Sequence, residues 1–88
     1  MIFITLTKWR NKPTQESIAQ IDKLFEKAVK EGAKILDRYW TLGRCDAVVI
    51  IETRDEKAAM KTLARFGDFV STETLVAVPR EQAIKLLE

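Results

Sequence analysis

Residues 39–53 have the sequence YWTLGRCDAVVIIET. The glycine-containing segment 42–46 predicts a β-hairpin that joins a strand over residues 33–41 to a strand over residues 47–53. The second strand is apolar on both of its alternating sides, whereas a strand with one side in water alternates apolar and polar residues. We therefore expect both faces of the sheet to be covered.

The order of the predicted elements decides the fold class. Thr14 and Asp55 are typical helix N-caps, and each precedes apolar residues that recur every three or four positions up to a glycine. The order β-α-β-β-α-β, followed by a short C-terminal helix, is the split pattern of ferredoxin-like α+β domains. Such a domain has a four-stranded antiparallel sheet with its two main helices on one face. The predicted strands cover residues 2–7, 33–41, 47–53 and 71–78, and the predicted helices cover residues 15–31, 56–66 and 80–87.

The two faces of the predicted sheet differ in what covers them. The helices cover one face, so the other face needs a second partner because residues 47–51 are apolar throughout. The simplest partner is the same face of a second copy, related by a two-fold axis. We therefore expect a homodimer or a higher homo-oligomer.

Length and composition exclude several classes of protein. The chain has 88 residues, enough for one domain over 1–88, and a net charge of +2, which does not indicate a nucleic-acid or membrane surface. It has no histidine and one cysteine, which excludes Ser-His-Asp and Cys-His catalysis and an internal disulfide, and does not favour a metal site. We expect a cytoplasmic protein without a cofactor. The many charged and few amide side chains are typical of heat-stable proteins.

The segment TLGRCD (residues 41–46), the apolar strand that ends at Glu52, and the segment TETL (residues 72–75) resemble the GYD family, small proteins named for a Gly-Tyr-Asp motif. The resemblance covers nearly the whole chain and implies a dimeric α/β barrel, in which two sheets pack face to face. The motif glycine and aspartate correspond to Gly43 and Asp46, and Cys45 stands in the place of the tyrosine. The resemblance to this family implies no particular activity. Related dimeric barrels include monooxygenases, haem-processing enzymes and effector-sensing domains, so the fold does not indicate a function.

The motif residues have simple structural interpretations. Gly43 permits a positive φ, and Asp46 is suited to accept backbone N–H bonds at the turn. Cys45 as a nucleophile lacks a proton acceptor, and its neighbours Arg44 and Asp46 oppose each other in charge. We interpret Cys45 as a small residue beside the turn.

Polar and aromatic strand residues are the better candidates for a binding site. We expect Thr5, Thr7 and Glu73 to point toward the second face, where they are joined either by Tyr39 or by Arg38 with Trp40, depending on the alternation of residues 33–41. Glu73 in such a place would be an acid or base, or an ion-pair partner of Arg38.

The residues leave two hypotheses for function. The first is a homo-oligomeric small-molecule-binding or accessory module with a pocket between facing sheets. The alternative is a cofactor-free enzyme of the monooxygenase or isomerase kind that uses Glu73 and Tyr39 in acid-base roles. RNA recognition is disfavoured because the strand over residues 47–53 has no aromatic residue on which a base can stack.

Overall fold

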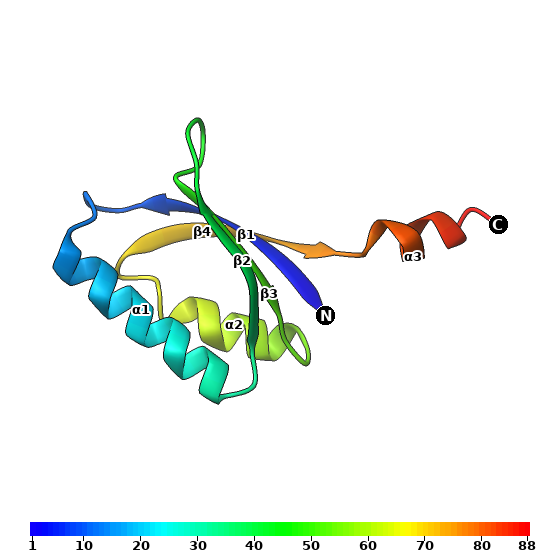
Figure 1. Ribbon diagram of the computed structural model, residues 1–88, viewed down its shortest axis with the longest axis horizontal. Coiled ribbons are helices and arrows are strands. Elements are labelled where there is room, and N and C mark those ends of the chain that lie inside the picture. Colours follow the sequence, from blue (N-terminus) through cyan, green and yellow to red (C-terminus); the bar gives the residue numbers. More distant parts are fainter.

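The computed structural model describes residues 1–88 as four strands and three helices in the predicted order (Figure 1). The observed hairpin connection is residues 41–46, one residue longer than predicted. None of the helices is both long enough and apolar enough to cross a lipid bilayer. The elements are β1 (Ile2–Trp9), α1 (Gln15–Lys30), β2 (Lys34–Trp40), β3 (Ala47–Glu52), α2 (Glu56–Ala64), β4 (Val70–Ala77) and α3 (Arg80–Lys85).

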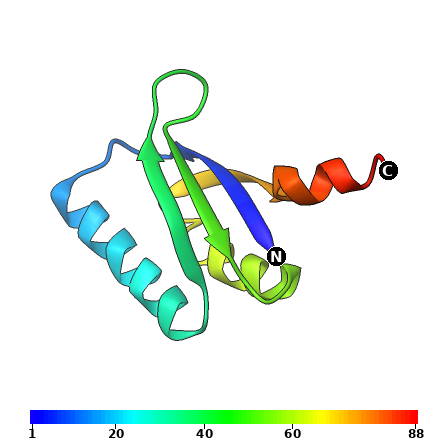
Figure 2. The same cartoon turned by 45° about the vertical axis from the view of Figure 1, so that its right-hand side comes forward.

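The four strands form one antiparallel sheet in the order β2-β3-β1-β4. Both main helices lie on the same side of this sheet, below it in Figure 1, and Figure 2 shows α1 next to β2. This arrangement confirms the predicted ferredoxin-like class. We call the side under the helices the covered face and the other side the open face.

Side-chain caps start both main helices where the sequence predicts. The Ser17 backbone N–H donates to Thr14 Oγ1 over 3.0 Å, and the Thr14 N–H donates to Ser17 Oγ over 2.9 Å, so the two residues form a reciprocal capping box. The Ala58 N–H donates to Asp55 Oδ1 over 2.9 Å, and this bond holds the pKa of Asp55 below its ordinary value. Gly32, just after α1, has a φ of +108°, the left-handed conformation that favours glycine.

The ends of the two helices are joined by an ion pair. Arg65 Nη1 and Nη2 donate to Glu31 Oε1 and Oε2 over 2.6 and 3.0 Å, and Lys61 Nζ lies 4.0 Å from the same carboxylate. The hydrogen bonds from Arg65 lower the pKa of Glu31, and the carboxylate raises the pKa of Arg65. This pair fixes the C-terminal end of α1 against the end of α2.

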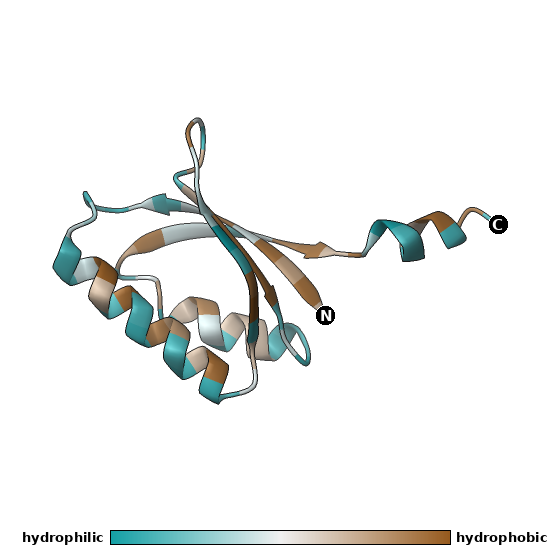
Figure 3. Cartoon of the chain, viewed as in Figure 1, coloured by the Kyte–Doolittle hydropathy of each residue, from teal (hydrophilic) through white to brown (hydrophobic).

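The residues of β1 are distributed between the faces in an unexpected way. Phe3, Thr5 and Thr7 are buried on the covered face, whereas Ile2, Ile4 and Leu6 alternate with them toward the open face. The prediction that Thr5 and Thr7 point toward the second face is therefore wrong. The more apolar side of the central strand is the side that the helices do not cover, and hydropathy is high along β3 and at the start of β1 (Figure 3).

A β-bulge determines which residues of β2 face the helices. The register shifts between Ile35 and Asp37, so Leu36 is an extra residue in the ladder. As a result Arg38 and Trp40, which pair with Val49 and Ala47, lie on the covered face together with Ile35.

The C-terminal segment extends away from the rest of the molecule (Figure 1). No residue of α3 is buried, and the apolar side chains of this segment are exposed. The chain consequently measures 50 Å in its longest direction and 17 Å in its shortest. The exposed apolar residues in and beside α3 are Val78, Ile84, Leu86 and Leu87.

Candidate ligand-binding site

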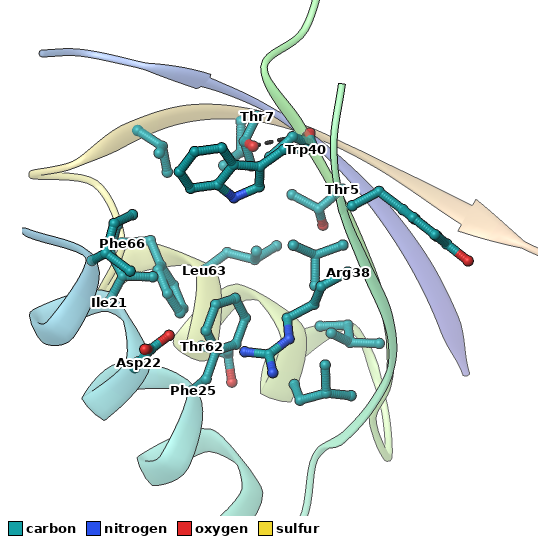
Figure 4. Close-up of a pocket in the computed structure, with 18 of the residues that line it drawn as sticks. Thr5, Thr7, Ile21, Asp22, Phe25, Arg38, Trp40, Thr62, Leu63 and Phe66 are labelled. Atoms are coloured by element: carbon teal, nitrogen blue, oxygen red, sulfur yellow. Dashed lines mark hydrogen bonds between the residues drawn. The ribbon is translucent and has the colours of Figure 1, made fainter. Parts of the chain in front are cut away.

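A cavity of about 300 Å³ lies between the covered face and the two main helices (Figure 4). Most of its lining is hydrophobic, and its walls come from the three strands β1, β2 and β3, from the start of β4 and from both helices. Phe25 of α1 and Phe66, just after α2, pack against each other at a ring-centroid distance of 4.9 Å and form the wall on the helix side. This volume is within the lower part of the range that small-molecule sites occupy.

Small side chains at the centre of the sheet leave this space empty. Thr5 and Thr7 lie where the central strand of a packed core usually carries large aliphatic residues, and Thr62 of α2 also lines the cavity. Three buried threonines line this cavity, which is partly open to solvent, at positions where a close-packed core would carry larger apolar side chains.

The hydroxyls of Thr5 and Thr7 are hydrogen-bonded within the chain. The Oγ1 atoms of Thr5 and Thr74 lie 3.0 Å apart, and Thr7 Oγ1 donates to the carbonyl oxygen of Ala47 over 3.0 Å. A single bond between two hydroxyls uses one of their two protons and one of their oxygens. The pair at Thr5 and Thr74 therefore keeps the capacity to donate to and accept from another group.

Arg38 crosses from β2 toward α1 along one wall of the cavity. Its Cζ atom lies 4.9 Å from the centroid of the Phe25 ring, a cation–π contact. No carboxylate of the chain lies within 4.0 Å of its guanidinium, although Asp22 of α1 also borders the cavity. The cavity thus has one cationic and one anionic group that are not paired with each other.

Two tryptophans form another wall of the cavity. The rings of Trp9 and Trp40 pack edge to face, with centroids 5.3 Å apart and an interplanar angle of 69°. Trp40 is 66% exposed, so its ring stands between the cavity and solvent.

The hairpin motif positions this wall. Asp46 Oδ2 accepts from the Trp9 backbone N–H over 2.9 Å, and the Asp46 N–H donates to the carbonyl oxygen of Thr7 over 2.7 Å. Gly43 has a φ of +107°. Cys45 is half-buried outside the cavity, with its Sγ atom 3.4 Å from Thr41 Oγ1. In this chain the motif joins the hairpin to the end of β1.

The predicted site residues divide between the two faces. Thr5, Arg38 and Trp40 meet at the cavity, which lies between sheet and helices, on the opposite side of the sheet from the predicted pocket. Glu73 pairs with Leu6 and lies on the open face. Tyr39 alternates with Arg38 and Trp40, so its side chain leaves the sheet on the open face, although part of the residue borders the edge of the cavity.

Tyr39 and Glu73 share one row of the open face but lie in its two edge strands. The row runs from Tyr39 through Val48 and Leu6 to Glu73. Three interstrand spacings separate its ends by about 14 Å. Within one chain, these two side chains are too far apart to act together on one bond, so the acid-base pair that the sequence suggested is not assembled.

Several cavity residues are not predicted by the sequence pattern. Asp22 and Phe25 belong to an ordinary amphipathic helix and carry no distinguishing signal. Thr62 does carry one, since it interrupts the apolar stripe of α2 between Ala59 and Leu63. A polar residue inside such a stripe indicates a place where the core is not simply packed.

Comparison with known proteins identifies the family. The profile of the GYD domain matches residues 1–87. The chain belongs to the GYD family. No curated protein sequence is significantly similar to this chain.

Among solved structures, this GYD domain is similar to TTHA0845 from Thermus thermophilus. The two have a TM-score of 0.54 and 20% sequence identity over 90% of this chain and 98% of that one. At this identity the likeness establishes the ferredoxin-like fold of the GYD domain and nothing further.

Proposed function

We propose that this GYD protein is a small-molecule-binding module that holds its ligand in the cavity on the covered face and assembles as a homodimer through the open face. The observation that carries the proposal is the cavity of about 300 Å³ over buried threonines at the centre of the sheet. The cavity is partly open to solvent and its lining is largely apolar, so a bound molecule would remove apolar surface from water, which matters in a chain with so small a core.

The lining indicates a largely apolar ligand. Ile51, Val49 and Phe66 offer hydrophobic surface, while the hydroxyls of Thr5 and Thr7 offer a few oriented polar contacts. Small-molecule sites typically combine an apolar wall with a small number of such groups. The ring of Trp40 separates the cavity from solvent and is itself exposed, so we expect a ligand to enter on this side.

The composition of the open face supports the homodimer. Its central strands carry large aliphatic side chains that a single chain leaves half-buried. Packing two such faces together would remove them from water, as in other sheet-on-sheet packings, and a two-fold axis brings identical surfaces together. The aliphatic residues of this face are Ile2, Ile4, Leu6, Val48, Ile50 and Leu75.

Filling the cavity tests the binding function. The neutral aromatic probe N-phenyl-1-naphthylamine should bind the wild-type chain and shift the amide resonances of Thr5, Thr62 and Trp40. Thr62→Leu should weaken this binding at least tenfold by occupying the cavity, and Thr5→Ile should do the same from the sheet side.

The matched control is Ala64→Val, which adds volume on the exposed side of the same helix. It should leave the affinity for the probe unchanged while all three variants keep the wild-type circular dichroism spectrum. Binding that persists undiminished in folded Thr62→Leu and Thr5→Ile would contradict the proposed site.

A further inference from the structure

We propose that Arg38 recognises an anionic group, so that the ligand of the cavity is a small organic monoanion with an aromatic or branched apolar body. This inference rests on the proposed binding function and specifies its ligand class. It follows from three observations: Arg38 packs on Phe25, its guanidinium has no carboxylate partner in the chain, and Asp22 borders the same cavity.

Two arginines of the chain show the difference between a structural and an unpaired guanidinium. Arg65 donates two hydrogen bonds to Glu31, at 2.6 and 3.0 Å, and so joins two helices. Arg38 has no carboxylate within 4.0 Å and makes no side-chain hydrogen bond within the chain. Its planar set of donors remains available for a carboxylate or sulfonate, which it can bind through two parallel bonds.

The surroundings hold Arg38 in place and strengthen a charge pairing there. The Phe25 ring lies under the guanidinium at 4.9 Å, which limits its positions without using its hydrogen-bond donors. Arg38 is exposed in the free chain, but apolar residues make up most of the cavity wall, so an anion bound between this wall and the guanidinium is partly shielded from water and interacts with Arg38 more strongly than in open water. A ligand anion that contacts Arg38 from inside the cavity would therefore bind with its apolar body against β1 and α2.

Asp22 limits the charge that the ligand can carry. It borders the cavity from α1, and Figure 4 shows it on a different wall from Arg38. A second negative group on the ligand would meet this carboxylate instead of a cation. The arrangement favours one anionic group at the Arg38 side and an uncharged remainder.

Two probes with a common aromatic body test the inference. 8-Anilinonaphthalene-1-sulfonate carries a sulfonate that N-phenyl-1-naphthylamine lacks. Arg38→Gln should weaken binding of the sulfonate probe at least tenfold and change the affinity for the neutral probe less than twofold. Arg44→Gln, which removes the same charge from the exposed hairpin, should change neither affinity.

The outcomes separate this inference from the proposed function. Equal losses for both probes in Arg38→Gln, or no loss for either, would overturn the role of Arg38 while leaving the cavity as a binding site. If neither probe shifts the amide resonances of cavity residues in the wild-type chain, the binding function itself is wrong and this inference fails with it. Asp22→Asn should raise the affinity for the sulfonate probe severalfold, and a decrease would contradict the proposed placement of charges.

Discussion

The two faces of the sheet carry different kinds of side chain on the same strands. On the covered face the central strand presents Thr5 and Thr7, which are small and hydroxylated, and on the open face it presents Ile4 and Leu6, which are large and aliphatic. A monomeric domain of this fold would place the aliphatic residues under the helices. In the proposed function, the open face supplies stability through assembly and the covered face binds a ligand.

The largest expected effect comes from placing a charge on the open face. Ile50→Glu should prevent assembly, raising the dissociation constant of the dimer at least 100-fold, because an unpaired carboxylate buried between two sheets costs several kcal/mol. Sedimentation velocity measures the association. The control is Met60→Glu, which makes the same charge change at an exposed position of α2 and should leave the sedimentation coefficient unchanged. If both variants sediment as dimers, the open face is not the dimer interface.

Adjacent residues of β1 allow the two faces to be compared directly. Ile4→Thr should lower the free energy of unfolding by about 1–3 kcal/mol, because it removes apolar area from the open face. Thr5→Val should change it by less than about 1 kcal/mol, because added apolar burial offsets the lost bond to Thr74. Urea denaturation at one protein concentration measures both values. A larger loss from Thr5→Val than from Ile4→Thr would reverse the assignment of the faces.

A smaller effect is expected at the hairpin that positions the tryptophan wall. Asp46→Ala leaves the Trp9 N–H without its partner and should cost about 1–2 kcal/mol of unfolding free energy. It should also shift the tryptophan emission, since Trp9 packs on Trp40. Asp68→Ala, at an exposed aspartate, should do neither. An unchanged emission spectrum in Asp46→Ala would argue against this role of the motif aspartate.

The smallest effect is the pH dependence of the ion pair between the helices. The pKa of Glu31 lies below its ordinary value of 4.5, with the hydrogen bonds from Arg65 as the main cause. The stabilisation is therefore fully present above about pH 4.5 and is lost as the pH falls through the lowered pKa. Glu31→Gln should show a shallower loss of stability over this acidic range, and the difference should be small because the pair is exposed. Parallel pH profiles for the two proteins would show that the pair contributes nothing.

The sequence predicts the fold well because its local signals agree with one another. Thr14 and Asp55 start the helices, Gly32 follows the first, and the run of residues 47–51 indicates a sheet whose second face is apolar. The alternation of β1 predicts the wrong side toward the helices, because its more apolar side, Ile2, Ile4 and Leu6, lies on the open face and the side with Thr5 and Thr7 is buried. The sequence also does not predict the alternation of β2, because the bulge at Leu36 reverses it without a glycine or proline to mark the place.

The sequence also predicts only part of the candidate site. Thr5, Arg38 and Trp40 are recognisable as unusual strand residues, but the face that they share depends on the bulge. Thr62 is visible as a polar interruption of an apolar stripe. Asp22 and Phe25 become cavity residues only through the packing of α1 against the sheet, a tertiary contact that no local pattern encodes.

The most direct test of the division between the two faces is an isotope-filtered nuclear Overhauser measurement on the wild-type chain with bound N-phenyl-1-naphthylamine. We expect contacts from the probe to the methyl groups of Thr5, Thr7 and Thr62, and none to those of Ile4, Leu6 or Ile50. Contacts to the methyl groups of Ile4, Leu6 and Ile50 instead would place the ligand on the open face and overturn the proposed division.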